Sequence, residues 1–581
     1  MKLLSIILIS CLGIFVYSNT FFCSFHFDDI PYIVGNFYIR DIHNLQNIWN
    51  WWPCRFITFF SFAFNYHFYQ FNVVGYHLFN LVVHLVSAIF VWWLVNLTFS
   101  TPAMKEAFAD EAIGNIADLV SLFSGLVFVS HPIQTQAVTF IWQRAASMAA
   151  LFYLASLCFY VKSRLSVRTG NPAGRPYYYI LSLITAMMAM FTKENAITLP
   201  LMIVLYEFSF FRTNRRVAIP FLLIFLIIPL TWTLSESEKF QARHSFFTNI
   251  SSMQYLLTEF RVILTYIRLA FLPYHQNLDY DYSHSKSIFE VSTFSSFIFL
   301  IVILLFAKRM FSKYRLVSFS IFWFFLTLLP ESSFFPFADV IEEHRLYLPL
   351  AGYSMFLVSG AYYVIVTYCH FESPSLRSRA GSGRRILRHL KILRCAQDDK
   401  RLWLVVLMMI IACYSVLTYQ RNKVWKDEFT LWSDVVRKSP HKARPYNSLG
   451  LIYEKQGNST EALGLYNKAI EIFPNYAEAY NNRGLLYYKQ DNFTAALSDY
   501  NKAIEIKPDL VNAHNNRGLL YTKEGKFTQA ILDFNRCIEL NPNFAKGFVN
   551  RGIVWARQGN FTQSLSDYTR AIKINPNDPR F

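Results

Sequence analysis

The stretch Ala477–Leu510 reads AEAYNNRGLLYYKQDNFTAALSDYNKAIEIKPDL, and a closely similar pattern returns every 34 residues from Ala443 onward. Apolar and aromatic side chains recur in both halves of the stretch, which predicts two helices joined by a short turn. Gly484 lets the two helices approach each other, and Pro508 ends the second helix because proline cannot continue it. Such a unit buries its apolar face only by stacking on neighbouring copies.

Four complete copies of this unit occupy residues 443–581, and a half repeat at 421–442 leads into them. The period and the glycine, aromatic and proline positions resemble the tetratricopeptide repeat, which implies a solenoid with a concave groove and no chemistry of its own. Asn482, Asn516 and Asn550 recur at equivalent positions on the first helices. These amides either hold an extended peptide by its backbone or are solvated surface residues, and the sequence leaves both readings open.

Residues 1–420 contain long apolar stretches. Over the whole chain 54% of residues are hydrophobic, 18% are aromatic and only 16% are charged. We expect the apolar surplus to face lipid, in an all-α polytopic bundle of about eleven membrane-spanning helices. The candidate spans are 3–19, 73–97, 117–131, 147–161, 178–192, 195–211, 217–234, 290–307, 316–330, 346–368 and 402–419. No small-residue cleavage site follows the first span, so we expect it to be retained rather than removed as a signal peptide.

Positive charge orients these spans, because short loops rich in Lys and Arg stay in the cytoplasm. Basic stretches follow the fourth, sixth, eighth and tenth spans, at 162–175, 212–216, 308–315 and 377–401. The N-terminus is then cytoplasmic, and everything after Leu417 lies outside, so the repeats are expected to be periplasmic, extracellular or lumenal. The membrane would be the inner or plasma membrane of a prokaryote or the endoplasmic reticulum of a eukaryote. We interpret 375–400 as a basic cytoplasmic insertion, a flexible loop on anionic lipid.

The net charge of +17 does not indicate nucleic acid, because the basic residues lie between apolar segments as membrane topology requires. Eight scattered cysteines show neither a CxxC pair nor the spacing of zinc ligands, so no disulfide framework and no metal site is expected from them. The sequence assigns no cofactor, and it leaves a role for a divalent metal open.

Four polar clusters lie at the predicted membrane boundary on the outer side, where charged residues are costly and usually functional. They are His26–Asp29, His131–Gln136 with Gln143 and Arg144, Lys193–Asn195, and Glu342–Pro349. Each cluster alone has the composition of a turn, a helix cap or a snorkelling ion pair. Together they suit a reaction with an anionic, lipid-borne substrate, since cations hold a phosphate leaving group and a carboxylate deprotonates an incoming hydroxyl. An amphipathic stretch at 255–268 predicts an interfacial helix beside them.

These clusters resemble polytopic glycosyltransferases of the C superfamily, specifically the transmembrane and tetratricopeptide-repeat O-mannosyltransferases, in a prokaryotic-type member. The resemblance rests on Asp28–Asp29 followed by Ile33 and Asn36, HPIQTQAVTFIWQRA at 131–145, KENAITLP at 193–200 and EHRLYLPLAG at 343–352. It implies a polyprenyl-phosphate sugar as donor, undecaprenyl-linked in a prokaryote. It also implies transfer of mannose to Ser or Thr of polypeptides that the repeats bind.

The same resemblance makes Asp28 or Asp29 the catalytic base. The residues that it proposes for the donor phosphate or the substrate are His131, Arg144, Lys193, Glu194, Glu343, His344, Arg345 and Tyr347. Two other functions stay open: a polysaccharide ligase or polymerase acting on lipid-linked glycans, and a membrane scaffold whose repeats recruit a partner. Substitution of the acidic pair separates them, because only the transferase should lose glycan transfer while it stays folded.

Overall fold

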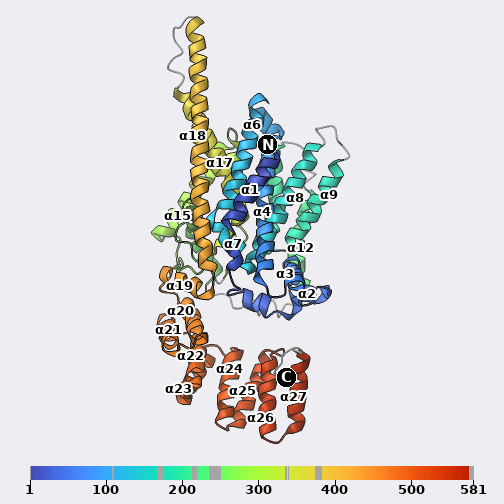
Figure 1. Ribbon diagram of the computed structural model, residues 1–581, viewed down its shortest axis with the longest axis vertical. Helices are drawn as coiled ribbons and strands as arrows, with labels where there is room; N and C mark the ends of the chain where they lie inside the picture. The colour runs from blue at the N-terminus through green and yellow to red at the C-terminus, as the bar shows by residue number, and fades with distance from the viewer. Residues whose placement is uncertain are drawn as a thin grey trace. The chain divides into compact units, whose positions relative to one another are not determined.

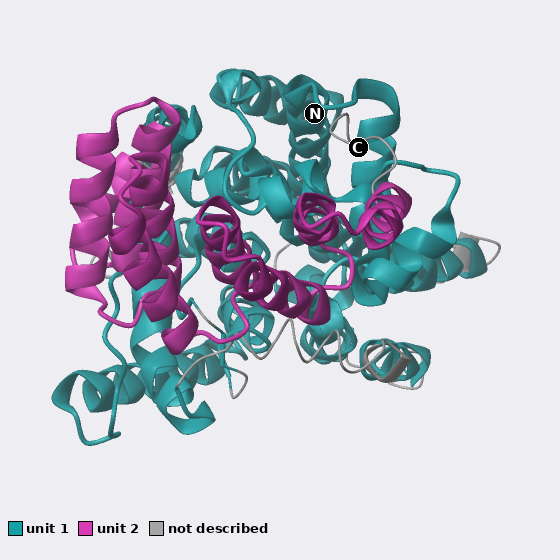
Figure 2. Cartoon of the chain, turned by 90° about the horizontal axis from the view of Figure 1, so that it is seen from below, with its two compact units in different colours: residues 1–428 teal, residues 429–581 magenta. Residues whose placement is uncertain are grey.

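The computed structural model describes residues 2–107, 110–166, 174–211, 219–234, 250–333, 336–337, 339–372 and 382–574. These residues form helices and connecting turns, with no β-strand among them. The all-α prediction is therefore confirmed over the described residues. The chain divides into two compact units, residues 1–428 and 429–581 (Figure 2).

Unit 1 is built from long apolar helices that run alongside one another (Figure 1). Helix α4 (Val73–Phe99) has 27 residues, which corresponds to about 40 Å and exceeds the hydrocarbon thickness of a bilayer. It packs against α1 (Lys2–Val16), α6 (Asp110–Ser130) and α8 (Arg144–Ser166). The largest cluster of buried hydrophobic residues lies among these helices.

Glycine permits close approaches between these helices. A Cβ on Gly125 of α6 would stand 2.6 Å from Ile9 Cδ1 in α1 and 3.3 Å from the carbonyl oxygen of Ala88 in α4. A larger side chain would therefore crowd both neighbouring helices, since a well-packed interior has little room to give.

The other helices of unit 1 continue the bundle. They are α5 (Pro102–Ala107), α9 (Gly174–Met190), α10 (Leu199–Phe210), α11 (Ile219–Ile224), α12 (Ile227–Leu234), α14 (Ser252–Phe271), α15 (Val291–Met310), α16 (Arg315–Leu328), α17 (Pro349–Glu372) and α18 (Ser382–Asn422). Short helices occupy the loops. They are η1 (Thr20–Phe22), η2 (Ile30–Val34), η3 (Phe37–Ile39), α2 (Leu45–Trp51), η4 (Pro53–Arg55), α3 (Phe56–Tyr69), η5 (Pro132–Gln134), α7 (Thr135–Thr139), η6 (Ile141–Gln143), η7 (Glu194–Thr198), η9 (Glu343–Leu346) and η11 (Lys423–Trp425).

The expected number of membrane spans was too high. Within the described residues, six helices are long and apolar enough to cross a membrane, or seven if a pair bent by 50° between Ser130 and Pro132 is one span. Three expected spans correspond to shorter apolar helices, at Pro176–Met190, Ile219–Thr231 and Arg315–Leu328. An apolar run does not reveal where a helix bends or breaks, and this is why about eleven segments of the sequence passed as spans.

Two other expected segments can be compared with the structure. The basic insertion at 375–400 lies partly outside the described residues, and its residues 382–400 are the first part of the helix α18 instead of a flexible loop. The expected interfacial helix is α14, whose N-terminus is capped by Ser251 and whose buried face includes Tyr255 and Glu259.

Unit 2 is a series of helix pairs, as the 34-residue period predicts. Its helices are α19 (Glu428–Lys438), α20 (Ala443–Lys455), α21 (Ser459–Ile472), α22 (Ala477–Lys489), α23 (Phe493–Ile506), α24 (Val511–Lys523), α25 (Phe527–Leu540), α26 (Ala545–Arg557) and α27 (Phe561–Ile574). In each pair a glycine of the first helix lies against an aromatic ring of the second, as Gly484 does against Tyr500. Helix α19 falls in the predicted half repeat, and the last seven residues, 575–581, lie outside the described residues.

Candidate functional site

The loop between α1 and α4 carries the acidic pair. Asp29 is fully buried, and both of its carboxylate oxygens accept backbone hydrogen bonds. Oδ2 accepts from the N–H of His26 at 2.9 Å, and Oδ1 accepts from the N–H of Trp142 at 2.7 Å. Burial raises the pKa of Asp29 well above its usual value, and these two bonds oppose that rise. Asp29 thereby fastens the first loop to the turn that contains Trp142.

Asp28 has a different environment. It is half-buried, and it follows Phe27, whose φ of 41° is unusual for a residue with a bulky side chain. The charge of Asp28 contributes to the raised pKa of Asp29. Two adjacent carboxylates in unlike environments can take unlike roles. Here the buried carboxylate is an anchor, and the half-buried one keeps access to solvent.

Aromatic rings connect the acidic pair to the next cluster. Tyr32 stacks on Trp142 with 4.2 Å between ring centroids. The guanidinium of Arg55 lies 4.6 Å from the ring centroid of Trp52 and 5.9 Å from that of Trp142. Arg55 also donates to Glu194 through Nε at 3.1 Å and Nη2 at 3.0 Å. Glu194 is thus a partner of Arg55, a residue that the sequence analysis did not single out.

Lys193 lies beside Glu194 at the start of η7. Its side chain is only 7% exposed, and its Nζ is 2.6 Å from Oε1 of Glu331. The other oxygen of Glu331, Oε2, has no hydrogen-bond partner among the described residues. In the structure Lys193 is therefore held by a carboxylate, which occupies a position that another anion could take.

His344 and Arg345 are adjacent in η9 but have different surroundings. His344 donates its backbone N–H to Oε1 of Gln136 at 2.7 Å, and its Nδ1 is buried without a partner in the described part of the chain. Burial and the neighbouring charges of Lys193 and Arg345 lower the pKa of His344 well below its usual value. The imidazole is accordingly neutral.

The guanidinium of Arg345 holds the segment that precedes it. It donates to the carbonyl oxygens of Asp339 at 2.7 Å and Val340 at 2.9 Å, and to Oε2 of Glu342 at 3.0 Å. Its side chain is only 1% exposed. Most of its hydrogen-bonding capacity is thus used to hold Asp339, Val340 and Glu342.

Glu259 on α14 is a further member of this cluster. It is fully buried, and its Oε1 lies 4.0 Å from Nη1 of Arg345. Burial raises the pKa of Glu259 to about 7. Glu259 falls within the predicted amphipathic stretch at 255–268, and a glutamate among its apolar positions is the signal in the sequence for this buried charge.

Four other predicted site residues are bound into the framework. His131 uses Nε2 toward the carbonyl oxygen of Ala270 at 2.8 Å, and its Nδ1 accepts from the N–H of Ile133. Glu343 accepts from the hydroxyl of Tyr280 at 2.6 Å. The hydroxyl of Tyr347 contacts Nδ1 of His84 at 2.8 Å in the helix core.

Arg144 is the fourth, and it is fully buried. It donates to Oδ1 of Asn80 at 2.6 Å, to the carbonyl oxygen of Tyr76 at 3.0 Å and to that of Ser61 at 3.2 Å. Its charge also lowers the pKa of Asp29. Arg144 therefore joins α3, α4 and α8 behind the acidic pair.

The structure thus brings the acidic pair, Lys193, Glu194 and His344 into one connected region, with Arg345 behind it. The predicted asparagines lie in unit 2, and each binds another asparagine in the preceding repeat. Asn482 Nδ2 donates to Asn447 Oδ1 at 3.0 Å, and Asn550 Nδ2 donates to Asn515 Oδ1 at 2.7 Å. Asn516 donates in the same way to Asn481 at 3.0 Å. The ladder is therefore a contact between successive repeats.

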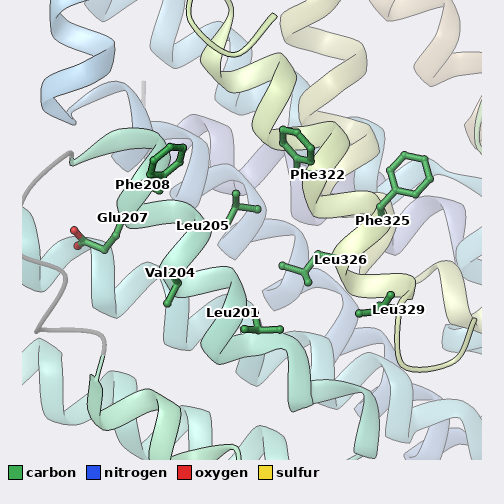
Figure 3. A pocket seen from close by; sticks show the side chains of 9 residues that line it. All are labelled: Leu201, Val204, Leu205, Glu207, Phe208, Phe322, Phe325, Leu326 and Leu329. Carbon is green, nitrogen blue, oxygen red and sulfur yellow. The ribbon is translucent and has the colours of Figure 1, made fainter. Parts of the chain in front are cut away.

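An apolar cavity of about 640 Å³ lies between α10 and α16 (Figure 3). Leu201 and Leu329 line one part of it, and Phe208, Phe322 and Glu207 line another. Leu329 is two residues from Glu331, so this part of the cavity adjoins the Lys193–Glu331 pair along the chain. Among the described residues, no group of three or more His, Cys, Asp or Glu side chains is placed to hold a metal ion.

Comparisons with known proteins agree with both parts of the chain. Tetratricopeptide-repeat family models match residues 442–509, 511–544 and 545–578, which confirms the prediction for the repeats. A solved chain described as "Crystal structure of MamA" is 20% identical, with a TM-score of 0.24, and covers 26% of this chain and 90% of its own.

Curated relatives extend the similarity through most of the chain. Protein O-mannosyl-transferase Tmtc3 of Drosophila melanogaster is 24% identical over 81% of this chain and 55% of its own length. Protein O-mannosyl-transferase TMTC3 of Homo sapiens is 23% identical over 78% of this chain and 50% of its own length. Protein O-mannosyl-transferase F38B6.6 of Caenorhabditis elegans is 23% identical over 80% of this chain and 62% of its own length. The chain spans about half the length of the first two of these relatives.

Proposed function

We propose, from the premise that this chain belongs to the transmembrane and tetratricopeptide-repeat family, that it is a membrane glycosyltransferase. It transfers a mannose-like hexose from a polyprenyl-phosphate donor to Ser or Thr residues of proteins. The observation that carries the proposal is the half-buried carboxylate of Asp28 beside an Asp29 whose two oxygens are both fixed by hydrogen bonds. An accessible base on a rigid anchor suits proton transfer from a hydroxyl.

In the proposed reaction, Asp28 accepts the proton of the acceptor hydroxyl. The acceptor oxygen forms a bond to the anomeric carbon of the sugar, and the bond from that carbon to the phosphate oxygen breaks. The polyprenyl phosphate leaves with the electron pair of the broken bond. Attack from the face opposite the leaving group inverts the anomeric configuration.

Lys193 and His344 are the groups we assign to the donor phosphate. Lys193 supplies a buried positive charge, which is worth more in a site that excludes water. It is paired with Glu331, so the phosphate would take the place of that carboxylate. The neutral His344 has a buried ring nitrogen without a partner in the described residues, which suits one hydrogen bond to phosphate or sugar. Arg345 serves this assignment by holding the residues just before η9, Asp339, Val340 and Glu342.

The cavity between α10 and α16 supports a lipid-linked donor. Its lining is apolar except for Glu207, which is paired with Arg164 at 2.6 Å. Leu201 and Phe208 lie seven residues apart on α10, which gives about 10 Å of apolar groove along the helix. Val204 and Phe208 are 40% and 55% exposed, so the groove opens sideways, where a prenyl chain would enter from the bilayer.

The acceptor polypeptide would be bound by the repeats, on the same non-cytoplasmic side as the acidic pair. The concave face of a repeat array suits this role. The asparagine ladder contributes less than a free amide row would, because its amides are engaged with one another.

Mass spectrometry of intact secreted or envelope proteins tests the proposal. Cells with the wild-type gene, without it, and with Asp28→Asn are compared. We expect hexose mass increments on particular proteins in the wild type alone. Unchanged protein masses together with altered surface polysaccharide would favour a polysaccharide ligase or polymerase, and no change in either would favour a scaffold.

A further inference from the structure

The segment that follows the last span of unit 1 returns to the first loop and binds it. Asn422 is fully buried, and its Nδ2 donates to the carbonyl oxygen of Val16 at 3.2 Å and to Oδ1 of Asn19 at 3.1 Å. Its Oδ1 accepts from the hydroxyl of Thr139 at 3.0 Å. One asparagine side chain therefore joins the end of α1, the end of α7 and the end of α18.

The next turn, η11 (Lys423–Trp425), binds the loop closer to the acidic pair. The backbone N–H of Ser24 donates to the carbonyl oxygen of Lys426 at 3.1 Å. Nε2 of His26 lies 2.6 Å from the carbonyl oxygen of Trp425. Because a carbonyl only accepts, Nε2 carries the hydrogen, and burial lowers the pKa of His26 to about 4. His26 is then a neutral donor at ordinary pH.

Trp425 also contacts the turn whose backbone binds Asp29. Its ring stacks on Phe140 with 5.3 Å between centroids and 20° between the ring planes. Phe140 is two residues before Trp142, whose N–H donates to Oδ1 of Asp29. His26 donates its backbone N–H to Oδ2 of the same carboxylate. Trp425 thus supports both donors to Asp29. Its carbonyl group binds His26, and its ring stacks on Phe140, next to the turn that contains Trp142.

We propose that His26 and Trp425 are positioning residues for the acidic pair, so that the lead-in to the repeats is a structural part of the active centre. Asp29 holds its place only while η11 is seated against the first loop, and Asp28 is its immediate neighbour. A displacement of about 1 Å at a reacting group costs on the order of a hundredfold in rate. Unseating η11 therefore lowers catalysis without touching a substrate. This inference rests on the proposed function only in taking Asp28 as the base.

Kinetics of the purified full-length protein test the brace through His26. The variants are His26→Ala, His26→Gln, whose amide nitrogen takes about the place of Nε2, and His43→Ala as a control in an exposed part of the same loop. We expect His26→Ala to lower kcat by ten- to a hundredfold at unchanged KM for the donor. His26→Gln should recover most of this loss, and His43→Ala should match the wild type. Equal activity of His26→Ala and His43→Ala would overturn the proposal.

A double-variant cycle tests whether His26 and Trp425 act as one unit. We expect the loss in His26→Ala combined with Trp425→Ala to be smaller than the product of the two single losses, since either change releases the same carboxylate. Strictly multiplicative losses would contradict the shared brace.

Amide hydrogen exchange separates a failure of this inference from a failure of the proposed function. In the full-length protein, either substitution should raise exchange in peptides that contain residues 23–34 and 140–144. This readout needs no sugar transfer. If Trp425→Ala leaves both peptides as protected as in the wild type, the brace does not exist, whatever reaction the protein catalyses.

Discussion

At the scale of single residues, the two aspartates of the first loop have separate physical positions. Asp29 satisfies two buried N–H groups, and such groups are costly to leave without acceptors. Asp28 is half-buried and keeps access to solvent. Structure and chemistry should therefore respond differently to the same substitution at the two positions.

We predict that Asp28→Asn lowers kcat on the order of 10²- to 10⁴-fold, the usual contribution of a positioned base, with an unchanged melting temperature. Asp29→Asn should destabilise the fold by about 1–3 kcal/mol, because the amide NH₂ group would face one of the two N–H donors. Asp41→Asn, at an exposed position of the same loop, is the control. Thermal unfolding and transfer rates measured on the same preparations check this, and equal melting temperatures for the Asp28 and Asp29 variants would contradict it.

Glu259 allows a prediction about pH. Its pKa rises from 4.5 to about 7 on folding, so the folded state binds this proton more tightly than the unfolded chain does. Its contribution to stability is therefore complete below pH 4.5 and is lost as the pH rises through about 7. A shift of this size corresponds to about 3 kcal/mol.

We expect the stability of the wild type to fall between pH 5 and pH 8 relative to that of Glu259→Gln, which cannot ionise. Denaturation in detergent at several pH values measures the difference, with Glu106→Gln, at an exposed position, as the control. Parallel pH profiles for the wild type and Glu259→Gln would show that the carboxyl group does not titrate in this range.

At the scale of secondary-structure elements, the groove between α10 and α16 allows a prediction about donor binding. Val204→Trp should fill it and raise KM for a long-chain polyprenyl-phosphate sugar by about tenfold, while kcat changes little. Val302→Trp is the matched control, since Val302 is 54% exposed on α15 and does not line the cavity. Equal KM values for the two tryptophan variants would remove the groove from the donor site.

The elements also show what a single sequence can predict. The helix pairs of unit 2 follow the prediction closely, with α20 beginning at Ala443 as expected, because glycine, proline and aromatic residues each have a local role that repeats. The spans of unit 1 were harder to predict, since an apolar run has the same composition whether its helix is straight, short or broken. The division of 217–234 into α11 and α12 is an example.

Some residues of the candidate site could likewise be predicted from the sequence, and others could not. Asp28, Lys193 and His344 were predicted as site residues because charged or polar residues next to apolar runs are rare enough to stand out. Arg55 and Glu331 were not singled out in the sequence, because what makes them notable is a partner far away in the chain. Arg55 and Glu194 are 139 residues apart. Predicting such a pairing requires knowing which helices are neighbours, and the periodicity of the sequence does not give this information.

At the scale of the whole of unit 1, the long-range contacts sort by the side of the membrane that charge assigned to each loop. The predicted outer loops bind one another, through His26 with Trp425 and Arg55 with Glu194. The opposite ends of the helices also bind one another, through Arg164 with Glu207. Likewise, Nη1 of Arg315 donates to the carbonyl oxygen of Ser209 at 2.9 Å, again between predicted inner ends. This agreement is what the predicted alternation of the loops requires.

The basic stretches determine which loops are expected in the cytoplasm, and they therefore predict the side of the membrane on which the repeats lie. Because the loops at 162–175, 212–216, 308–315 and 377–401 are rich in Lys and Arg, they should remain in the cytoplasm. The acidic pair and the repeats then lie together on the other side. We expect protease added outside sealed cells or right-side-out vesicles to digest a tag after the repeats and to spare a tag before α1. Digestion of both tags, or of neither, would mean an even number of crossings. In either case the repeats would lie across the membrane from the first loop, and the acceptor role of the repeats would fail with the parity.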